Sequence, residues 1–87
     1  MKLKREFVVR EIAGDIFLVP TGKTALNLNG MMTLNALGAE IWAMLPEVEG
    51  EEEIVQRILA EYDAEPVQIR ADVWDFLGKL RQMEIIY

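Results

Sequence analysis

The chain has 87 residues, of which 52% are hydrophobic and 28% are charged, and its formal net charge is −6. This size and balance predict one folded domain over residues 1–87 with a single small core. The sequence contains no cysteine and no histidine, which excludes disulfides, thiol nucleophiles, the usual zinc sites and imidazole acid–base chemistry.

The negative charge disfavours nucleic acid and anionic membrane surfaces as partners, because both repel an acidic protein. No apolar run reaches the roughly 20 residues that a membrane span requires. The basic start with Lys2, Lys4 and Arg5 resembles the opening of a signal peptide, but Arg10 and Glu11 interrupt the apolar segment that follows. We therefore expect a cytoplasmic protein that binds neither nucleic acid nor membrane.

The first third of the chain predicts a β-hairpin. Residues 7–12 and 15–19 are rich in β-branched and aromatic side chains, and Ala13-Gly14 separates them. This is the pattern of two strands around a short turn. Pro20 ends the second strand, because proline has no N–H for the ladder.

A third strand is expected after a loop at residues 21–28. Asn29-Gly30 is a turn signal, and Met31 to Leu34 form a short apolar run behind it. In a three-stranded meander this last strand lies at the edge of the sheet, where its outer N–H and C=O groups have no partner.

The remainder predicts three helices. The first begins after the N-cap Asn35 and stops at Pro46, and its apolar positions are Leu37, Ile41, Met44 and Leu45. The second begins with Glu51 to Glu53, whose charges suit a helix N-terminus, and its apolar stripe is Ile54, Val55, Ile58, Leu59 and Tyr62. The third begins at Pro66, and its core face is Ile69, Val73, Phe76, Leu77 and Leu80.

The expected order is therefore three strands followed by three helices. This is an α+β fold with a three-stranded antiparallel sheet and a three-helix bundle. Winged helix-turn-helix domains use the same parts, so we predict a winged helix-turn-helix-like architecture. The tail at residues 85–87 is apolar and is expected to pack back on the domain.

Two segments resemble one protein family. Residues 29–45 contain a short strand ending in Leu-Asn and then a Gly-Ala-x-Ile-Trp helix, and residues 71–80 contain Asp-Val-x-x-Phe-Leu-x-x-Leu. Both are similar to motifs of the family of the coenzyme pyrroloquinoline quinone synthesis protein D (PqqD-like proteins). A weaker match covers residues 53–63. The acidic connector at 47–50 and the absence of a glycine at 82–84 depart from the family pattern, which bears on the subfamily rather than the fold.

The resemblance implies a function without chemistry of its own and without a cofactor. Such domains hold the leader segment of a ribosomally made precursor peptide and present it to a modifying enzyme, often of the radical S-adenosylmethionine class, or to a peptidase of the same pathway. The leader is expected to add as a strand beside the third strand, in a groove that the third helix completes.

The candidate peptide-binding residues lie on these two elements. On the strand, we assign Leu34 to the core face and Met31 to the groove, whereas core packing explains Met32 equally well. On the helix, Trp74 is a candidate anchor with Arg70 and Arg81 on either side of it. The predicted set is Met31, Met32, Thr33, Leu34, Arg70, Trp74, Leu77 and Arg81.

The helix residues also have plain structural explanations. Trp74 could pack on the tail at Tyr87, and the two arginines could be solvated charges that pair with nearby acids such as Asp72, Asp75 or Glu84. Trp42 is expected in the core, and the acidic run 47–53 is expected to be a solvated connector that complements the helix dipole.

Three other functions stay open. A winged-helix DNA-binding regulator would need a basic recognition helix, but the third helix sets Arg70, Lys79 and Arg81 against Asp72 and Asp75. An enzyme is disfavoured, because no histidine, cysteine, phosphate loop or metal-ligand spacing is present. Alternatively, the edge strand could pair with a second copy and form a homodimer.

Overall fold

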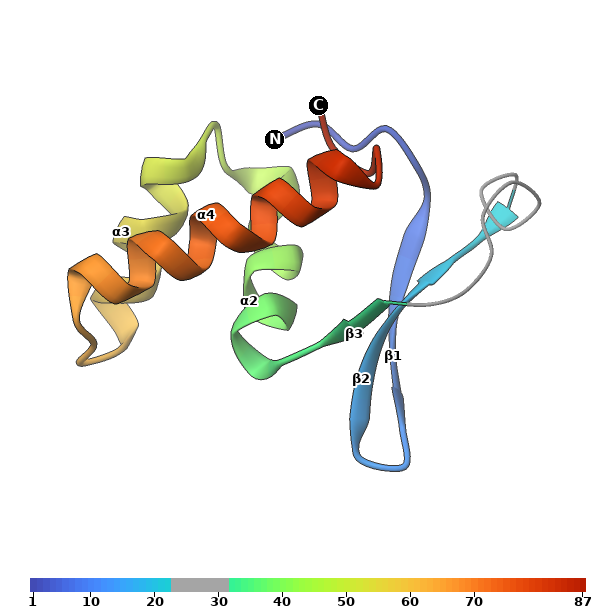
Figure 1. Ribbon diagram of the computed structural model, residues 1–87, viewed down its shortest axis with the longest axis horizontal. Helices are drawn as coiled ribbons and strands as arrows, with labels where there is room; N and C mark the ends of the chain where they lie inside the picture. Colours follow the sequence, from blue (N-terminus) through green and yellow to red (C-terminus); the bar gives the residue numbers. More distant parts are fainter. Residues whose placement is uncertain (23–31) are drawn as a thin grey trace.

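The computed structural model describes residues 1–22 and 32–87. The strands β1 (Phe7–Ile12), β2 (Asp15–Pro20) and β3 (Met32–Leu34) form an antiparallel sheet in the order β1-β2-β3. The sheet precedes the helices in the chain, and the hairpin of β1 and β2 extends away from them (Figure 1). β3 lies at the edge of the sheet, as predicted.

The turn of the hairpin explains why the first two strands pair where they do. Ile12 lies opposite Asp15, and both residues between them have positive φ, 52° for Ala13 and 88° for Gly14. Two-residue turns of this kind match the right-handed twist of the flanking strands. Glycine adopts this conformation readily, whereas the Cβ of Ala13 makes it costly. The predicted hairpin is thus confirmed, with a strained alanine at its tip.

Three helices follow the sheet, also as predicted. They are α2 (Ala36–Met44), α3 (Glu51–Glu61) and α4 (Pro66–Gln82), and a short 3-10 helix (Leu45–Glu47) follows α2. Asn35 caps α2, because its side-chain Oδ1 accepts a hydrogen bond from the N–H of Gly38 at 2.7 Å. The α+β fold class and the winged helix-turn-helix-like order of elements agree with the sequence prediction. None of the helices in the described ranges is long and apolar enough to span a membrane.

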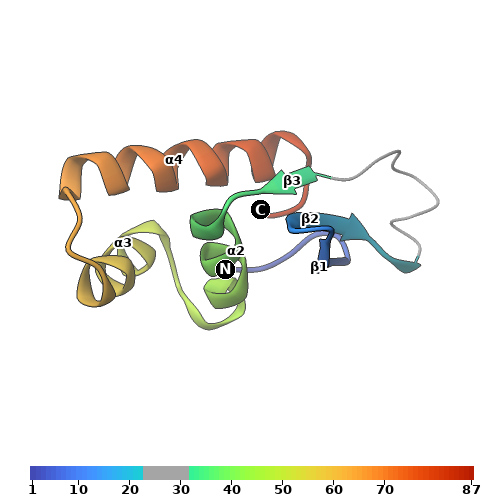
Figure 2. The same ribbon diagram turned by 90° about the horizontal axis from the view of Figure 1, so that it is seen from below.

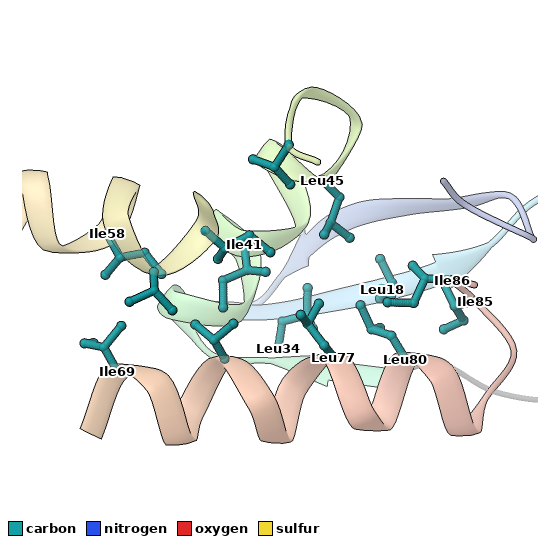
Figure 3. Packing of buried hydrophobic residues seen from close by; sticks show 14 of the residues in the cluster. Leu18, Leu34, Ile41, Leu45, Ile58, Ile69, Leu77, Leu80, Ile85 and Ile86 are labelled. Carbon is teal, nitrogen blue, oxygen red and sulfur yellow. The ribbon is translucent and has the colours of Figure 1, made fainter. Parts of the chain in front are cut away.

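The core lies where α4 crosses the other elements. Figure 2 shows β3 and α4 running alongside each other in opposite chain directions, with α2 beginning directly after β3. Buried side chains of α4 point toward α2, α3 and the sheet (Figure 3). The buried apolar residues are Phe7, Leu18, Leu34, Ile41, Leu45, Val48, Ile54, Val55, Ile58, Ile69, Val73, Leu77, Leu80, Ile85 and Ile86.

Most core predictions hold, but Tyr62 and Tyr87 are exposed. The tail packs back on the domain, since Ile85 and Ile86 are buried and Ile86 pairs with Leu3 in a β-bridge. Trp42 packs against the core, and its ring meets that of Phe7 edge to face at a centroid distance of 6.4 Å. Tyr62 was expected on the apolar stripe of the second helix, but it is 47% exposed, because α3 ends one residue earlier and the tyrosine hydroxyl turns to Glu40.

Candidate functional site

A groove of about 260 Å³ separates β3 from α4. One wall is the whole of β3, the other wall is one face of α4, and the first turns of α2 form the floor. Its lining residues are Met32, Thr33, Leu34, Asn35, Leu37, Gly38, Ile41, Asp72, Asp75, Phe76 and Lys79. None of these described residues belongs to β2, which pairs with the other side of β3. The unpaired edge of β3 therefore faces the groove, which we call the β3 groove.

Gly38 lies in the floor of the β3 groove. A Cβ at this position would lie 3.4 Å from Cε1 of Phe76, 3.6 Å from Cδ2 of Leu34 and 3.2 Å from Oδ1 of Asn35. The contacts with Phe76 and Leu34 would be ordinary van der Waals contacts, whereas the contact with Oδ1 of Asn35 would be tight, so the glycine keeps the Asn35 cap intact. Because Leu34 is only 5% exposed, it anchors the end of β3 in the core beside this contact. The Leu34 end of the groove thus rests on packed side chains.

The far wall of the groove carries charges of both signs. Asp72 is half-buried and accepts a hydrogen bond from Nε2 of Gln68 at 2.8 Å, while Asp75 and Lys79 are exposed. Asp72, Asp75, Phe76 and Lys79 line the wall at helical i, i+3, i+4 and i+7 spacing. An extended chain in the groove would meet an aromatic ring with acidic groups toward one end and a lysine toward the other.

The predicted strand residues all reach this groove where they are described. Leu34 points into the core, as predicted, Met32 is half-buried and packs against the core, and Thr33 is exposed. Their register opposite β2 pairs Met32 with Leu18 and Leu34 with Ile16. Met31 lies outside the described residues.

Two of the predicted helix residues lie in a different hollow. Arg70 and Trp74 line a depression of about 400 Å³ between α3 and α4, together with Glu51, Glu52 and Val55. The Arg70 guanidinium pairs with both carboxylate oxygens of Glu52, and its Nη2 donates to Oε1 at 2.9 Å. The hydrogen bond from Arg70 is the main reason that the pKa of Glu52 falls from 4.5 to about 2, and a hydrogen bond from Gln56 lowers it further. The ion pair links α3 to α4 across the surface.

Trp74 is 66% exposed within this second hollow, which we call the Trp74 hollow. It is not packed on the tail, because the ring of Tyr87 lies instead beneath Lys4, whose Nζ is 5.1 Å from the ring centroid. A large exposed aromatic side chain beside a hollow is a common anchor in protein interfaces.

The other two predicted helix residues do not line the β3 groove. Leu77 is fully buried, at 0% exposure, so it supports the groove from the core. Arg81 donates from Nε to the main-chain oxygen of Tyr87 at 3.2 Å and so holds the tail. The residues that sequence reasoning missed are the lining residues of α4, namely Asp72, Asp75, Phe76 and Lys79. Their i, i+3, i+4, i+7 spacing was visible in the sequence, on the other flank of the core stripe.

Comparisons with known proteins agree with this architecture. A family model described as coenzyme PQQ synthesis protein D (PqqD) matches residues 18–86. Among solved structures, the chain is similar to one described as "TbiB1 in Complex with the TbiA(beta) Leader Peptide". The two share 30% identity and a TM-score of 0.71, over 99% of this chain and 94% of that chain.

A second solved structure supports the fold alone. It is described as "Lasso peptide synthetase B1 complexed with the leader peptide", and it shares 17% identity and a TM-score of 0.71, over 99% of this chain and 95% of that chain. A search of curated proteins gave no match.

Proposed function

The chain belongs to the coenzyme PQQ synthesis protein D (PqqD) family, whose model matches residues 18–86, and from that premise we propose that it binds the leader segment of a ribosomally made precursor peptide. The leader adds as a fourth strand to β3 and lies in the β3 groove. The domain then presents the rest of the precursor to another enzyme of the same pathway. This enzyme is either a modifying enzyme of the radical S-adenosylmethionine class or a peptidase. The role is non-catalytic, and its expected place is the cytoplasm.

The observation that carries this proposal is the free edge of β3 beside the groove. In the described part of the chain, β3 pairs only with β2, so one row of its N–H and C=O groups is open to a ligand. A peptide strand satisfies such groups with little demand on its sequence, and pockets beside the strand supply specificity. The solved TbiB1 structure, which is 30% identical over 99% of this chain, supports this use because it holds a leader peptide.

The charges near α4 favour a peptide over DNA. A DNA-reading helix needs unpaired basic groups to neutralise phosphates. On α4, Arg70 is paired with Glu52, and Lys79 shares its groove with Asp72 and Asp75. With a net charge of −6, the chain also repels nucleic acid at long range. A DNA titration at low salt should therefore give no saturable binding.

The test is a titration of isotope-labelled protein with the leader of the precursor peptide encoded beside it, followed by amide chemical shifts. We expect shifts at Met32 to Leu34 and along α4 from Asp72 to Lys79. Shifts confined to residues around Trp74 would move the site to the Trp74 hollow. An absence of shifts at saturating concentrations of several neighbouring leaders would overturn the proposal.

Matched variants separate the two faces of α4. Phe76→Leu shortens the groove wall and should weaken leader binding, whereas Trp74→Leu alters an exposed side chain of the same helix and should leave binding unchanged. Because the free edge could also pair with a second copy, the molecular mass in solution should be measured with and without the leader. If the chain forms a dimer that dissociates when the leader binds, the leader and the second copy compete for β3.

A further inference from the structure

We propose that the β3 groove reads the order of charges in its peptide, selecting a basic residue that precedes an acidic residue by two positions. This inference rests on the proposed function, because it names the chemistry of the segment that β3 would pair with. Its specificity-determining residues are Asp75 and Lys79 on α4, and Asp72 lies beside Asp75 on the same wall.

The positions of these charges along the groove follow from the packing of Phe76. Its ring lies next to Gly38 and Leu34, and therefore opposite the end of β3 that leads into α2. Because β3 and α4 run in opposite directions (Figure 2), earlier residues of α4 lie beyond that end, and later residues lie toward Met32. Asp72 and Asp75 therefore mark the Leu34 end of the groove, and Lys79 marks the Met32 end.

Two of the three charged groups are available to a ligand. Within the described residues, the side chains of Asp75 and Lys79 take part in no hydrogen bond or ion pair. Two arginines elsewhere already form ion pairs. Arg57 pairs with Glu47 and Glu53, and Arg70 pairs with Glu52. Asp75 and Lys79 are four residues apart on one helix, but an exposed pair at this spacing is weak enough for a peptide to replace. The groove thus presents unneutralised charges of opposite sign.

The spacing of the two charges fits an extended chain. Four residues of helix separate Asp75 from Lys79 by about 6 Å along the axis, at about 1.5 Å per residue. Two residues of a β-strand cover nearly the same distance, at about 3.3 Å per residue, and residues i and i+2 face the same side. One peptide can therefore direct two side chains at Asp75 and Lys79 while both remain on its groove-facing side.

The direction of the peptide sets the order of the charges. The strand pairs of this sheet are antiparallel, and antiparallel pairing is slightly more stable than parallel pairing. A peptide antiparallel to β3 runs in the same direction as α4, so its earlier residue meets Asp72 and Asp75 and its later residue meets Lys79. Lysine or arginine followed two positions later by glutamate or aspartate is the matching order.

The test uses the leader that gives β3 shifts in the titration described above. Two versions of this leader are synthesised with identical composition. In one version Lys precedes Glu by two residues, and in the other Glu precedes Lys by two residues. The two substituted positions are then moved together, one residue at a time, along the bound segment. At one register the Lys-first peptide should bind about tenfold more tightly, because two weak attractions become two repulsions when the order is reversed. This preference should shrink as salt is added.

The matching experiment exchanges the two charges in the protein. The double variant Asp75→Lys with Lys79→Asp keeps the composition and the net charge, and it should reverse the preference in favour of the Glu-first peptide. The control is Glu52→Arg with Arg70→Glu, which exchanges charges in the Trp74 hollow and should leave the Lys-first preference intact.

The outcomes separate this inference from the proposed function. Binding with β3 shifts but without any order preference, or with the same preference in the exchanged variant, would overturn the charge reading and leave leader binding standing. A Glu-first preference in the natural protein would overturn the antiparallel assignment on which the order depends. A leader that gives no β3 shifts would overturn both.

Discussion

Strand addition to β3 makes a quantitative prediction about the peptide backbone. β3 spans only Met32 to Leu34, so an added strand can form about two or three backbone hydrogen bonds with it. At a net value of about 1 kcal/mol each, these contribute about 2–3 kcal/mol, which alone corresponds to a Kd weaker than about 1 mM. A micromolar complex therefore needs about 5–6 kcal/mol more from side chains in the β3 groove.

The perturbation is N-methylation of the leader, one residue at a time, with binding measured by calorimetry. Methylating an amide that points at β3 removes a hydrogen bond and inserts a methyl group into the ladder, so the affinity should fall about tenfold, or about 1.4 kcal/mol. Methylating the next amide, which points away, should change the affinity less than about twofold. Since successive amides alternate in direction and β3 is short, the loss should be confined to one amide or to two amides that lie two residues apart. A flat profile would refute strand addition, and sensitive amides three or four residues apart would instead favour a bound helix.

Three further predictions concern the scaffold. Arg70→Met should return the pKa of Glu52 from about 2 toward 4.5 in a carboxyl NMR titration, whereas Arg81→Met should leave it unchanged. Because folding lowers that pKa, the stabilisation from Glu52 is complete above pH 4.5 and is lost as the pH falls through about 2, so the variant should lose this part of its acid resistance. Asn35→Ala removes the α2 cap and should lower the free energy of unfolding by about 1 kcal/mol in urea, and no change would show that the cap contributes nothing. Ala13→Asn should raise the unfolding free energy by up to about 1 kcal/mol in the same assay, since asparagine tolerates positive φ better than alanine does; a loss would contradict the strain assigned to the turn.

Local signals in the sequence predicted most of the fold. The pair Ala13-Gly14 marked the hairpin, Asn35 marked the start of α2, and Pro66 marked the start of α4, each at the position where the structure has it. These predictions succeed because the conformation of a turn or a helix cap depends on one or two residues and on their own backbone. Tyr62, which was misplaced in the core, lies at the end of α3, where the apolar period continues but the helix does not.

The lining of the groove was harder to predict, because it depends on how helices pack. Periodicity identified the buried stripe of α4 at Val73, Leu77 and Leu80, but that stripe has two flanks. One flank carries Trp74 and lies against α3, and the other carries Phe76 and lies against β3. Which neighbour covers which flank follows from the crossing of α4 over the sheet and the bundle, and no spacing within α4 encodes that crossing.

The shortness of β3 bears on which partner the free edge selects. A second copy of the chain could pair with it only through a three-residue strand, and the resulting two or three hydrogen bonds would hold a dimer no more tightly than about 1 mM. At the proposed site, a leader would gain the same backbone bonds and would also fill the groove beside Phe76, where its side chains would meet apolar surface and the charges of Asp75 and Lys79. A short edge therefore discriminates against self-pairing, because it makes affinity depend on the groove. An edge of this length is therefore expected to favour a peptide over a second copy of the chain.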